Sequence, residues 1–411
     1  MLNKLHVFRA SWTLVDQGIV SLGAFLVNVQ LARQLAPEDY GTYALLLGAF
    51  LGLQLFNSSL LLYPMSIRLP VAKGAEPEVL AATTLLVATF CVPLCIVLAV
   101  GLTVFGRAEL VAPALAAFVF WQLQETMRRG LLAEFRHSAA AIGDAVCYLG
   151  QVGAVAALAF SGRLTLADAL AAMAAAAGLG AAIQALLLGL SFRRVADPGR
   201  TLAEFWRTGS WSLANNIVSL LRIQIFPWAL AAAGGAAAAA SFQAALNVVN
   251  LANPIILGLC NVIPQTAAHA QQSGGNAEAW RAARVYMLIG VPPTFGFYLV
   301  SLMAPALILS LFYGSASPYV ALTLAVQILV FAWAAGYMAD MTCSYLHGVD
   351  AARLALLINS LGAVSAMLLA VPLTRMYGLT GGCLSLVGAN LVRLAASHYI
   401  QTRIMAHERV A

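Results

Sequence analysis

Charged residues are scarce in this 411-residue sequence, at 9% of all positions, whereas a soluble domain carries about 25%. Hydrophobic residues make up 62% of the chain. No polar stretch is long enough to form a separate catalytic domain. The composition excludes a water-soluble globular protein and predicts a chain that lies mostly within a lipid bilayer.

Cysteine and histidine are also few, and they are not clustered. The six cysteines lie in apolar stretches without a Cys-x-x-Cys pair, and the spacing of the six histidines matches no metal site. We therefore expect no zinc site and no disulfide framework.

The apolar stretches are long and numerous. A helix that crosses a bilayer needs roughly 20 mostly apolar residues. Hydropathy and helix-breaking residues predict twelve spans, at residues 11–33, 41–63, 79–104, 110–127, 138–160, 166–190, 209–232, 238–263, 284–311, 319–345, 353–373 and 379–401. The sequence therefore predicts an all-α, polytopic membrane protein of about twelve transmembrane helices.

Lysine and arginine alternate from loop to loop along the chain. With a cytoplasmic N-terminus, the inner segments hold sixteen basic residues and the outer loops hold four. Basic loops are retained on the cytoplasmic side. We therefore predict a multi-pass protein of the bacterial inner membrane with both termini in the cytoplasm. The net charge of +6 is attributed to topology and to contact with anionic lipid head groups, and no nucleic-acid partner is expected.

The chain divides near its middle, at its most charged connection. This predicts an N-terminal six-helix bundle at 1–192, a cytoplasmic linker at 193–208 and a C-terminal six-helix bundle at 209–411. The two halves also begin alike, since SWTLVDQ at 11–17 aligns with SWSLANN at 210–216. Parallel repeats of this kind are a transporter architecture, with the substrate path at the interface of the halves and alternating access by rocking.

As a transporter without a catalytic domain, the chain is also expected to have no catalytic residues and no organic cofactor. A coupling ion, H⁺ or Na⁺, is the one small cofactor that the chain could use.

Two arginines fall inside predicted spans. A charged group inside the bilayer costs a few kcal/mol, so it usually faces a wet cavity or a partner. Arg222, near the middle of its span, either faces a central cavity and binds an anionic group through its guanidinium fork, or pairs with a carboxylate on a neighbouring helix. Arg393 could serve the same cavity, or its head group could extend to the inner interface.

Polar residues at equivalent places in the two repeats are further candidates for binding substrate. Asp16 aligns with Asn215, and Gln17 aligns with Asn216. These four side chains either line the cavity or supply hydrogen bonds between helices. Asp340, in the tenth span, could take up a proton or sodium ion and couple an ion gradient to transport, or it could pair with an arginine or lie at the inner interface.

Three loop sequences resemble turns of the multidrug/oligosaccharidyl-lipid/polysaccharide exporter superfamily, and within it those of the Wzx-type polysaccharide flippases. They are LARQLAPEDYGTYAL at 31–45, LFYGSASPYV at 311–320 and TRMYGLTGGCLS at 374–385. Their order and spacing, together with twelve spans and a duplicated half, extend the resemblance over essentially the whole chain.

The resemblance implies a V-shaped pair of six-helix bundles around a cationic central cavity. Such flippases carry a polyprenyl-pyrophosphate-linked oligosaccharide, a polysaccharide repeat unit, from the inner to the outer leaflet. Arg222, and with it Arg393, would bind the pyrophosphate. A polysaccharide polymerase and glycosyltransferases of exopolysaccharide or O-antigen synthesis would be the protein partners, and membrane lipids would surround the chain.

Two other functions are compatible with the sequence. The first is a multidrug or organic-cation antiporter of the same superfamily, although a cation antiporter should have acidic residues in its cavity and the most central charge here is an arginine. The second is a membrane-embedded glycosyltransferase or ligase. Such an enzyme needs a large outer loop to hold its acceptor, and the predicted outer loops are short.

Overall fold

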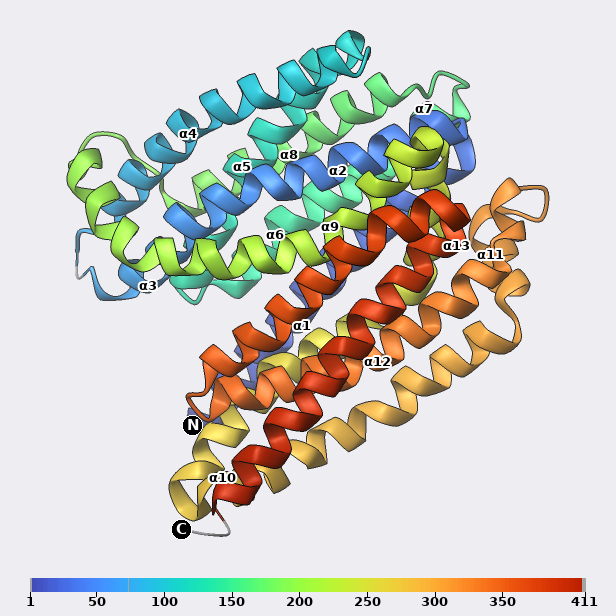
Figure 1. The fold of residues 1–411 in the computed structure, drawn as a ribbon. Helices are drawn as coiled ribbons and strands as arrows, with labels where there is room; N and C mark the ends of the chain where they lie inside the picture. Colours follow the sequence, from blue (N-terminus) through green and yellow to red (C-terminus); the bar gives the residue numbers. More distant parts are fainter. Residues whose placement is uncertain (1, 73, 409–411) are drawn as a thin grey trace. The chain divides into compact units, whose positions relative to one another are not determined.

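The computed structural model describes the backbone of residues 2–72 and 74–408, and their side chains except those of 2–11, 13, 14, 273 and 404–408. Within these ranges every regular element is a helix (Figure 1). The predicted all-α class is therefore confirmed. The chain forms two compact units. Apart from Pro37–Leu45, which belongs to the second unit, the chain divides after Ile217, inside helix α9 (Pro198–Val249).

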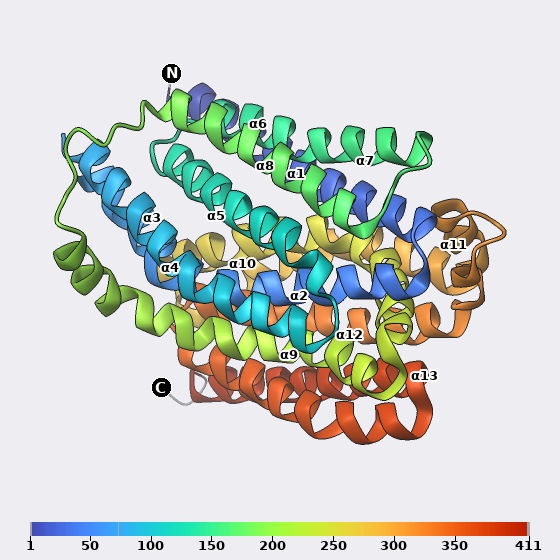
Figure 2. The same cartoon turned by 90° about the horizontal axis from the view of Figure 1, so that it is seen from above.

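Unit 1 comprises Met1–Ala36 and Leu46–Ile217. Its α5 packs against α4, α6 and α8, and α1 packs against α6 and α7 (Figure 2). The helices of this unit are α1 (Leu2–Gln34), most of α2 (Pro37–Asn57), α3 (Tyr63–Arg68), α4 (Glu76–Val104), α5 (Val111–Ala133), α6 (His137–Asp144), α7 (Gly150–Phe160), α8 (Leu166–Leu188) and the start of α9. One turn of π-helix joins α2 to α3, and another joins α6 to α7.

The connection predicted as a linker at 193–208 becomes helical part of the way along. Helix α9 begins at Pro198, whose missing N–H is no loss at the first helical position. The Asp197 carboxylate Oδ1 accepts hydrogen bonds from the backbone N–H groups of Gly199 (2.9 Å) and Arg200 (3.4 Å). This cap fixes the start of the helix and leaves a short irregular connection before it.

Unit 2 comprises Pro37–Leu45 and Val218–Ala411. Its α12 packs against both α10 and α13 (Figures 1 and 2). The helices of this unit are the rest of α9, α10 (Asn253–Met303), α11 (Pro305–Tyr313), α12 (Thr323–Gly348) and α13 (Ala352–Glu408). Three of these run through sharp kinks, at Gly235 in α9, at Gly274 and Gly275 in α10 and at Gly378 in α13.

The kinks divide the long helices where the sequence predicts breaks between spans. Gly378 has φ 55° and ψ −131°, a conformation that a residue with a Cβ atom rarely adopts. The chain reverses at this point, so the two halves of α13 form separate helical segments. Glycine at this position therefore allows the two helical segments to follow one another without a longer loop between them.

Hydropathy and length alone identify nine stretches, among the described residues, that could cross a membrane. Two of them, Pro198–Gln272 and Ala352–Arg403, each hold two helical segments separated by a kink. Helix α5 falls outside the nine because its second half carries Glu125, Arg128 and Arg129. With α5 added and the two kinked stretches divided, the structure matches the predicted spans, and the chain is a multi-pass membrane protein. The cytoplasmic location of the termini stays a prediction.

Two of the three loop sequences singled out above meet in unit 2. The Asn247 side-chain amide donates to the hydroxyls of Tyr40 (3.0 Å) and Tyr313 (3.3 Å), and the Tyr313 hydroxyl donates to the backbone carbonyl of Ala244 (2.9 Å). The ring of Tyr319 packs edge-on against those of Tyr40 and Tyr313. The tyrosines of these sequences therefore build one buried aromatic cluster within unit 2.

Candidate functional site

A cavity of about 460 Å³ opens within unit 2, lined by residues of α9, α10, α12 and α13. One part of its lining is apolar, with Phe226, Phe242, Leu246, Ile256, Leu257 and Trp333. The other part carries charges, from Arg222, Asp340 and Arg393, beside uncharged polar groups that include Asn250, Asn253, Tyr337 and Asn390. An apolar lining with a few convergent polar groups is typical of a ligand-binding site.

Helical periodicity explains how α12 contributes so many of these residues. Trp333, Gly336, Tyr337 and Asp340 recur at intervals of three and four, which brings them to one face of the helix. The same stripe continues through Ser344. The spacing around Asp340 could therefore have identified Trp333 and Tyr337 as cavity residues, but the sequence reasoning considered Asp340 alone.

Arg393 is held in the wall of the cavity by three acceptors. Its Nη2 donates to Asp340 Oδ1 (2.5 Å) and to Asn359 Oδ1 (2.9 Å), and its Nη1 donates to Asn390 Oδ1 (3.1 Å). The Arg393 side chain is 1% exposed and that of Asp340 is 36% exposed. Arg393 therefore does not extend to the membrane interface. It is a buried cation whose carboxylate partner faces the open space.

Arg222 lies in the same lining, one helical turn before Phe226 on α9. It is half-buried, and its Nε is buried without a hydrogen-bond partner. Among the ion pairs of the described residues, none involves Arg222, whereas Asp340 is paired with Arg393. The structure therefore brings three of the predicted residues, Arg222, Arg393 and Asp340, into one cavity and leaves one guanidinium without a counter-ion.

Gly362, on the first half of α13, makes room for both arginines. A Cβ atom built on Gly362 would lie 2.5 Å from Cγ and Cδ of Arg393 and 3.4 Å from Cδ of Arg222. The hydrocarbon stems of the two arginines therefore converge on the same glycine. Asp340 offsets the charge of Arg393, whereas Arg222 forms no ion pair, so the charge that remains for an anion to neutralise is that of Arg222.

The remaining predicted site residues lie in unit 1, and Asp16 belongs to a separate cluster of charges there. Arg128 Nη2 donates to Asp16 Oδ2 (2.7 Å), and Arg128 Nε donates to Asp144 Oδ2 (2.5 Å). Both aspartates are fully buried. The side chains of Gln124 and Gln184 also donate to Asp144 Oδ1, at 2.6 and 3.0 Å. Arg128 thus ties α1, α5 and α6 together.

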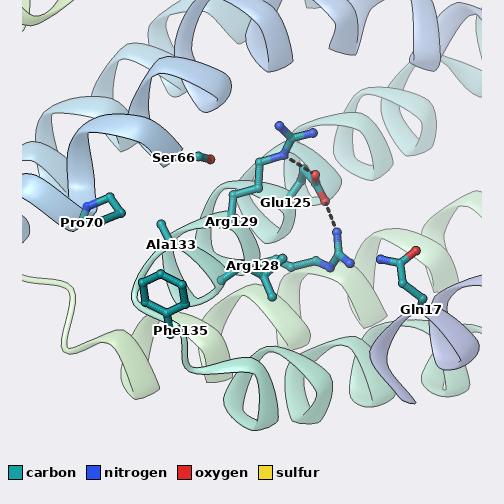
Figure 3. A pocket seen from close by; sticks show the side chains of 9 residues that line it. Gln17, Ser66, Pro70, Glu125, Arg128, Arg129, Ala133 and Phe135 are labelled. Atoms are coloured by element: carbon teal, nitrogen blue, oxygen red, sulfur yellow. Dashed lines mark hydrogen bonds and ion pairs between the residues drawn. The ribbon is translucent and has the colours of Figure 1, made fainter. Parts of the chain in front are cut away.

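Glu125 extends this cluster toward a pocket of about 420 Å³ (Figure 3). Its carboxylate lies between two guanidiniums, 2.6 Å from Arg129 Nε and 3.5 Å from Arg128 Nη1. Gln17 lines the same pocket, with its side-chain amide toward Arg128 in Figure 3. The structure buries both Glu125 and Asp144 within unit 1.

The residues aligned with Asp16 and Gln17 in the second repeat, Asn215 and Asn216, also fall in unit 1. The Asn216 amide donates to Ser59 Oγ (2.9 Å), which is the hydrogen bonding between helical segments that the sequence left open as an alternative, and to Ser212 Oγ (3.4 Å) within α9. Asn215 is exposed, and neither asparagine lines the cavity of unit 2. The lining of the cavity in unit 2 therefore includes none of the four aligned residues, Asp16, Gln17, Asn215 and Asn216.

The sequence matches no family model and no curated protein, but its structure resembles solved ones. The inward-facing conformation of a multidrug resistance MATE family transporter of the MOP superfamily has a TM-score of 0.83 at 16% identity, over 97% of this chain and 99% of that chain. A MATE structure in the straight conformation has a TM-score of 0.67 at 13% identity, over 98% of this chain and 96% of that one.

A third solved structure is a MOP superfamily transporter from Pyrococcus furiosus, for which a binding pocket of reverse polarity is described as suggesting a different function. Its TM-score is 0.64 at 14% identity, over 97% of this chain and 95% of that chain. At these identities the similarities are evidence for the fold alone. Nearly the whole chain has the fold of these MATE transporter structures.

Proposed function

We propose that this protein is an exporter that moves amphiphilic molecules with an anionic group across the membrane by alternating access. The observation that carries the proposal is the guanidinium of Arg222, which lines a cavity among apolar side chains and has no carboxylate partner. An uncompensated charge in such a setting is costly. A bound anion would relieve that cost.

The chemistry of the lining fits the two parts of such a substrate. A guanidinium offers a planar fork of donors that matches carboxylate, sulfonate or phosphate oxygens. Among the apolar residues of the lining, Leu257 is exposed and Trp333 is half-buried, and both present apolar surface for the hydrophobic part. The cavity therefore favours an amphiphilic anion over a plain inorganic ion.

The size of the cavity bears on which amphiphile is carried. At about 460 Å³ it lies within the range of about 300–1,000 Å³ that suits drug-sized ligands. Solved structures with this fold include a multidrug resistance transporter. Both observations support an exporter of the multidrug type, which the sequence left open as an alternative. The cationic cavity distinguishes it from an organic-cation antiporter.

A flippase for a polyprenyl-pyrophosphate-linked oligosaccharide is the second candidate. Arg222 in the lining is compatible with it, because a guanidinium suits phosphate oxygens. The cavity would hold only the head of such a lipid. In this role the protein would serve the bacterial inner membrane together with a polysaccharide polymerase and glycosyltransferases.

The proposal can be tested in liposomes that contain the purified full chain. The expected result is transport of the anionic amphiphile 1-anilinonaphthalene-8-sulfonate, with much slower transport of the cationic amphiphile rhodamine 6G. Arg222→Gln should abolish transport of the anion, and Arg353→Gln should not, because Arg353 is exposed outside the cavity. Faster transport of rhodamine 6G than of the sulfonate by the wild type would overturn the proposal.

A further inference from the structure

The charged groups that line the cavity can be counted. Among the described residues of the lining, the two arginines, Arg222 and Arg393, contribute two positive charges and Asp340 contributes the one carboxylate. His347 also lines the cavity and carries no charge above the ordinary titration range of imidazole. The lining therefore has a net charge of one positive unit before a substrate binds.

Asp340 forms an ion pair with Arg393. The guanidinium of Arg393 is almost completely buried, and Asn359 and Asn390 hold it in place. Removing its carboxylate partner would leave a buried cation uncompensated, which is far more costly than breaking an exposed ion pair. A substrate anion therefore does not gain by displacing Asp340, and Arg222 is the cation that remains available to it.

The available charge lies close to the pair of Arg393 and Asp340. A Cβ atom built on Gly362 would lie 3.4 Å from Cδ of Arg222 and 2.5 Å from Cγ and Cδ of Arg393, so both stems pass this glycine. Asp340 remains in the same lining, with a side chain that is about one-third exposed to the open space. An anionic head group at Arg222 therefore lies in the field of a fixed carboxylate as well as of the guanidinium.

From these observations we infer that the cavity is charge-matched to a head group with a single negative charge, such as a carboxylate, a sulfonate or a phosphodiester. This inference rests on the proposed function and narrows its substrate class. A monoanion at Arg222 brings the lining to neutrality. Each further negative charge, as in a pyrophosphate, would face Asp340 without a counter-ion and would be disfavoured.

The test uses one apolar tail with different head groups. Farnesoic acid, farnesyl pyrophosphate, farnesylamine and farnesol are titrated into the purified full chain in lipid nanodiscs, at about pH 8 and low ionic strength, and binding is followed by calorimetry. The wild type should bind the monoanion about tenfold more tightly than the pyrophosphate, a difference of about 1.4 kcal/mol. The amine should bind most weakly.

The variants shift the charge of the lining by one unit in each direction. Asp340→Asn raises it to two positive units and should move the preference toward the pyrophosphate. Arg222→Gln lowers it to zero and should make farnesoic acid and farnesol bind alike. The second variant removes no ion pair, so it remains informative if the first does not fold. Asp350→Asn, at an exposed position outside the cavity, is the matched control and should bind like the wild type.

Two results would overturn the charge match and leave the proposed function standing. They are pyrophosphate binding as tight as that of the monoanion in the wild type, and a folded Asp340→Asn protein with an unchanged ratio of the two affinities. A different result would reject the proposed function itself, namely tightest binding of farnesylamine, or anion binding that Arg222→Gln does not weaken.

Discussion

Gly362 and Arg393 are packed so closely that the glycine cannot be replaced without moving the arginine: a Cβ atom would lie 2.5 Å from its Cγ and Cδ. Real Cβ atoms essentially never approach other heavy atoms this closely. The position of the buried cation, and with it the contact to Asp340, therefore depends on a residue with no side chain. This links the packing of α13 to the electrostatics of the cavity.

Gly362→Ala is expected to destabilise the protein by about 1–3 kcal/mol, the usual cost of overpacking a well-packed site. The reason is that the new methyl group displaces Arg393 from its three acceptors. Thermal unfolding of the purified protein in detergent measures the effect. Gly258→Ala in α10 is the control, because a methyl group there meets open space. Equal unfolding temperatures for the two variants would contradict this account.

Arg128→Gln is expected to cost about 3–5 kcal/mol, since it leaves the buried carboxylates of Asp16 and Asp144 without their shared cation. Adding Asp144→Asn to this variant should restore part of the loss, because one of the unpaired charges disappears. Arg163→Gln, at an exposed arginine, serves as the control and should be nearly neutral. An Arg128→Gln protein as stable as the wild type would show that these ion pairs do not stabilise the fold.

The aromatic cluster of unit 2 offers a paired comparison. Tyr40→Phe removes a hydroxyl that accepts a hydrogen bond from buried Asn247, and it should destabilise the protein by about 1 kcal/mol. Tyr319→Phe should be neutral or slightly stabilising, because the Tyr319 hydroxyl is buried without a hydrogen-bond partner. Both are measured by thermal unfolding, and the reverse order of stability would refute the hydrogen bonding described here.

The ion-coupling role suggested for Asp340 stays a prediction. If this carboxylate takes up H⁺ or Na⁺, transport by Asp340→Asn should lose its dependence on the ion gradient. Transport of 1-anilinonaphthalene-8-sulfonate in liposomes, with and without a pH or sodium gradient, measures this. An Asp340→Asn protein that still responds to the gradient as the wild type does would leave Asp340 with its pairing role alone.

Much of the fold follows from the sequence, because bilayer-spanning helices need long apolar stretches that hydropathy detects. The glycines at 235, 274, 275 and 378 also fall near the predicted breaks. The end of α5 was harder to predict. The predicted span stops at residue 127, whereas α5 continues through Arg128 to Ala133. Charges that neutralise one another can be buried, and hydropathy, which scores residues singly, does not reveal such pairs.

The residues of the cavity were likewise predictable from the sequence only in part. Arg222 and Asp340 stand out in the sequence because single charges inside apolar spans are costly. Asn359 and Asn390 do not stand out, because an asparagine in a membrane helix costs less free energy than a charged residue and is more common. Asn390 lies three residues before Arg393 on the same half of α13. The contact of Asn359 depends on the reversal at Gly378, which brings the first half of α13 beside the second. Such a contact between distant residues cannot be read from spacing along one helix.

Reversing the charge at position 222 tests the central claim most directly. Arg222→Glu changes the charge of the lining from one positive to one negative unit, with the pair between Arg393 and Asp340 left intact. Binding of 1-anilinonaphthalene-8-sulfonate and of rhodamine 6G is then compared by fluorescence titration. We predict that the folded variant binds rhodamine 6G more tightly than the sulfonate, opposite to the wild type. A variant that still prefers the sulfonate would contradict the claim that Arg222 sets the selectivity of this cavity.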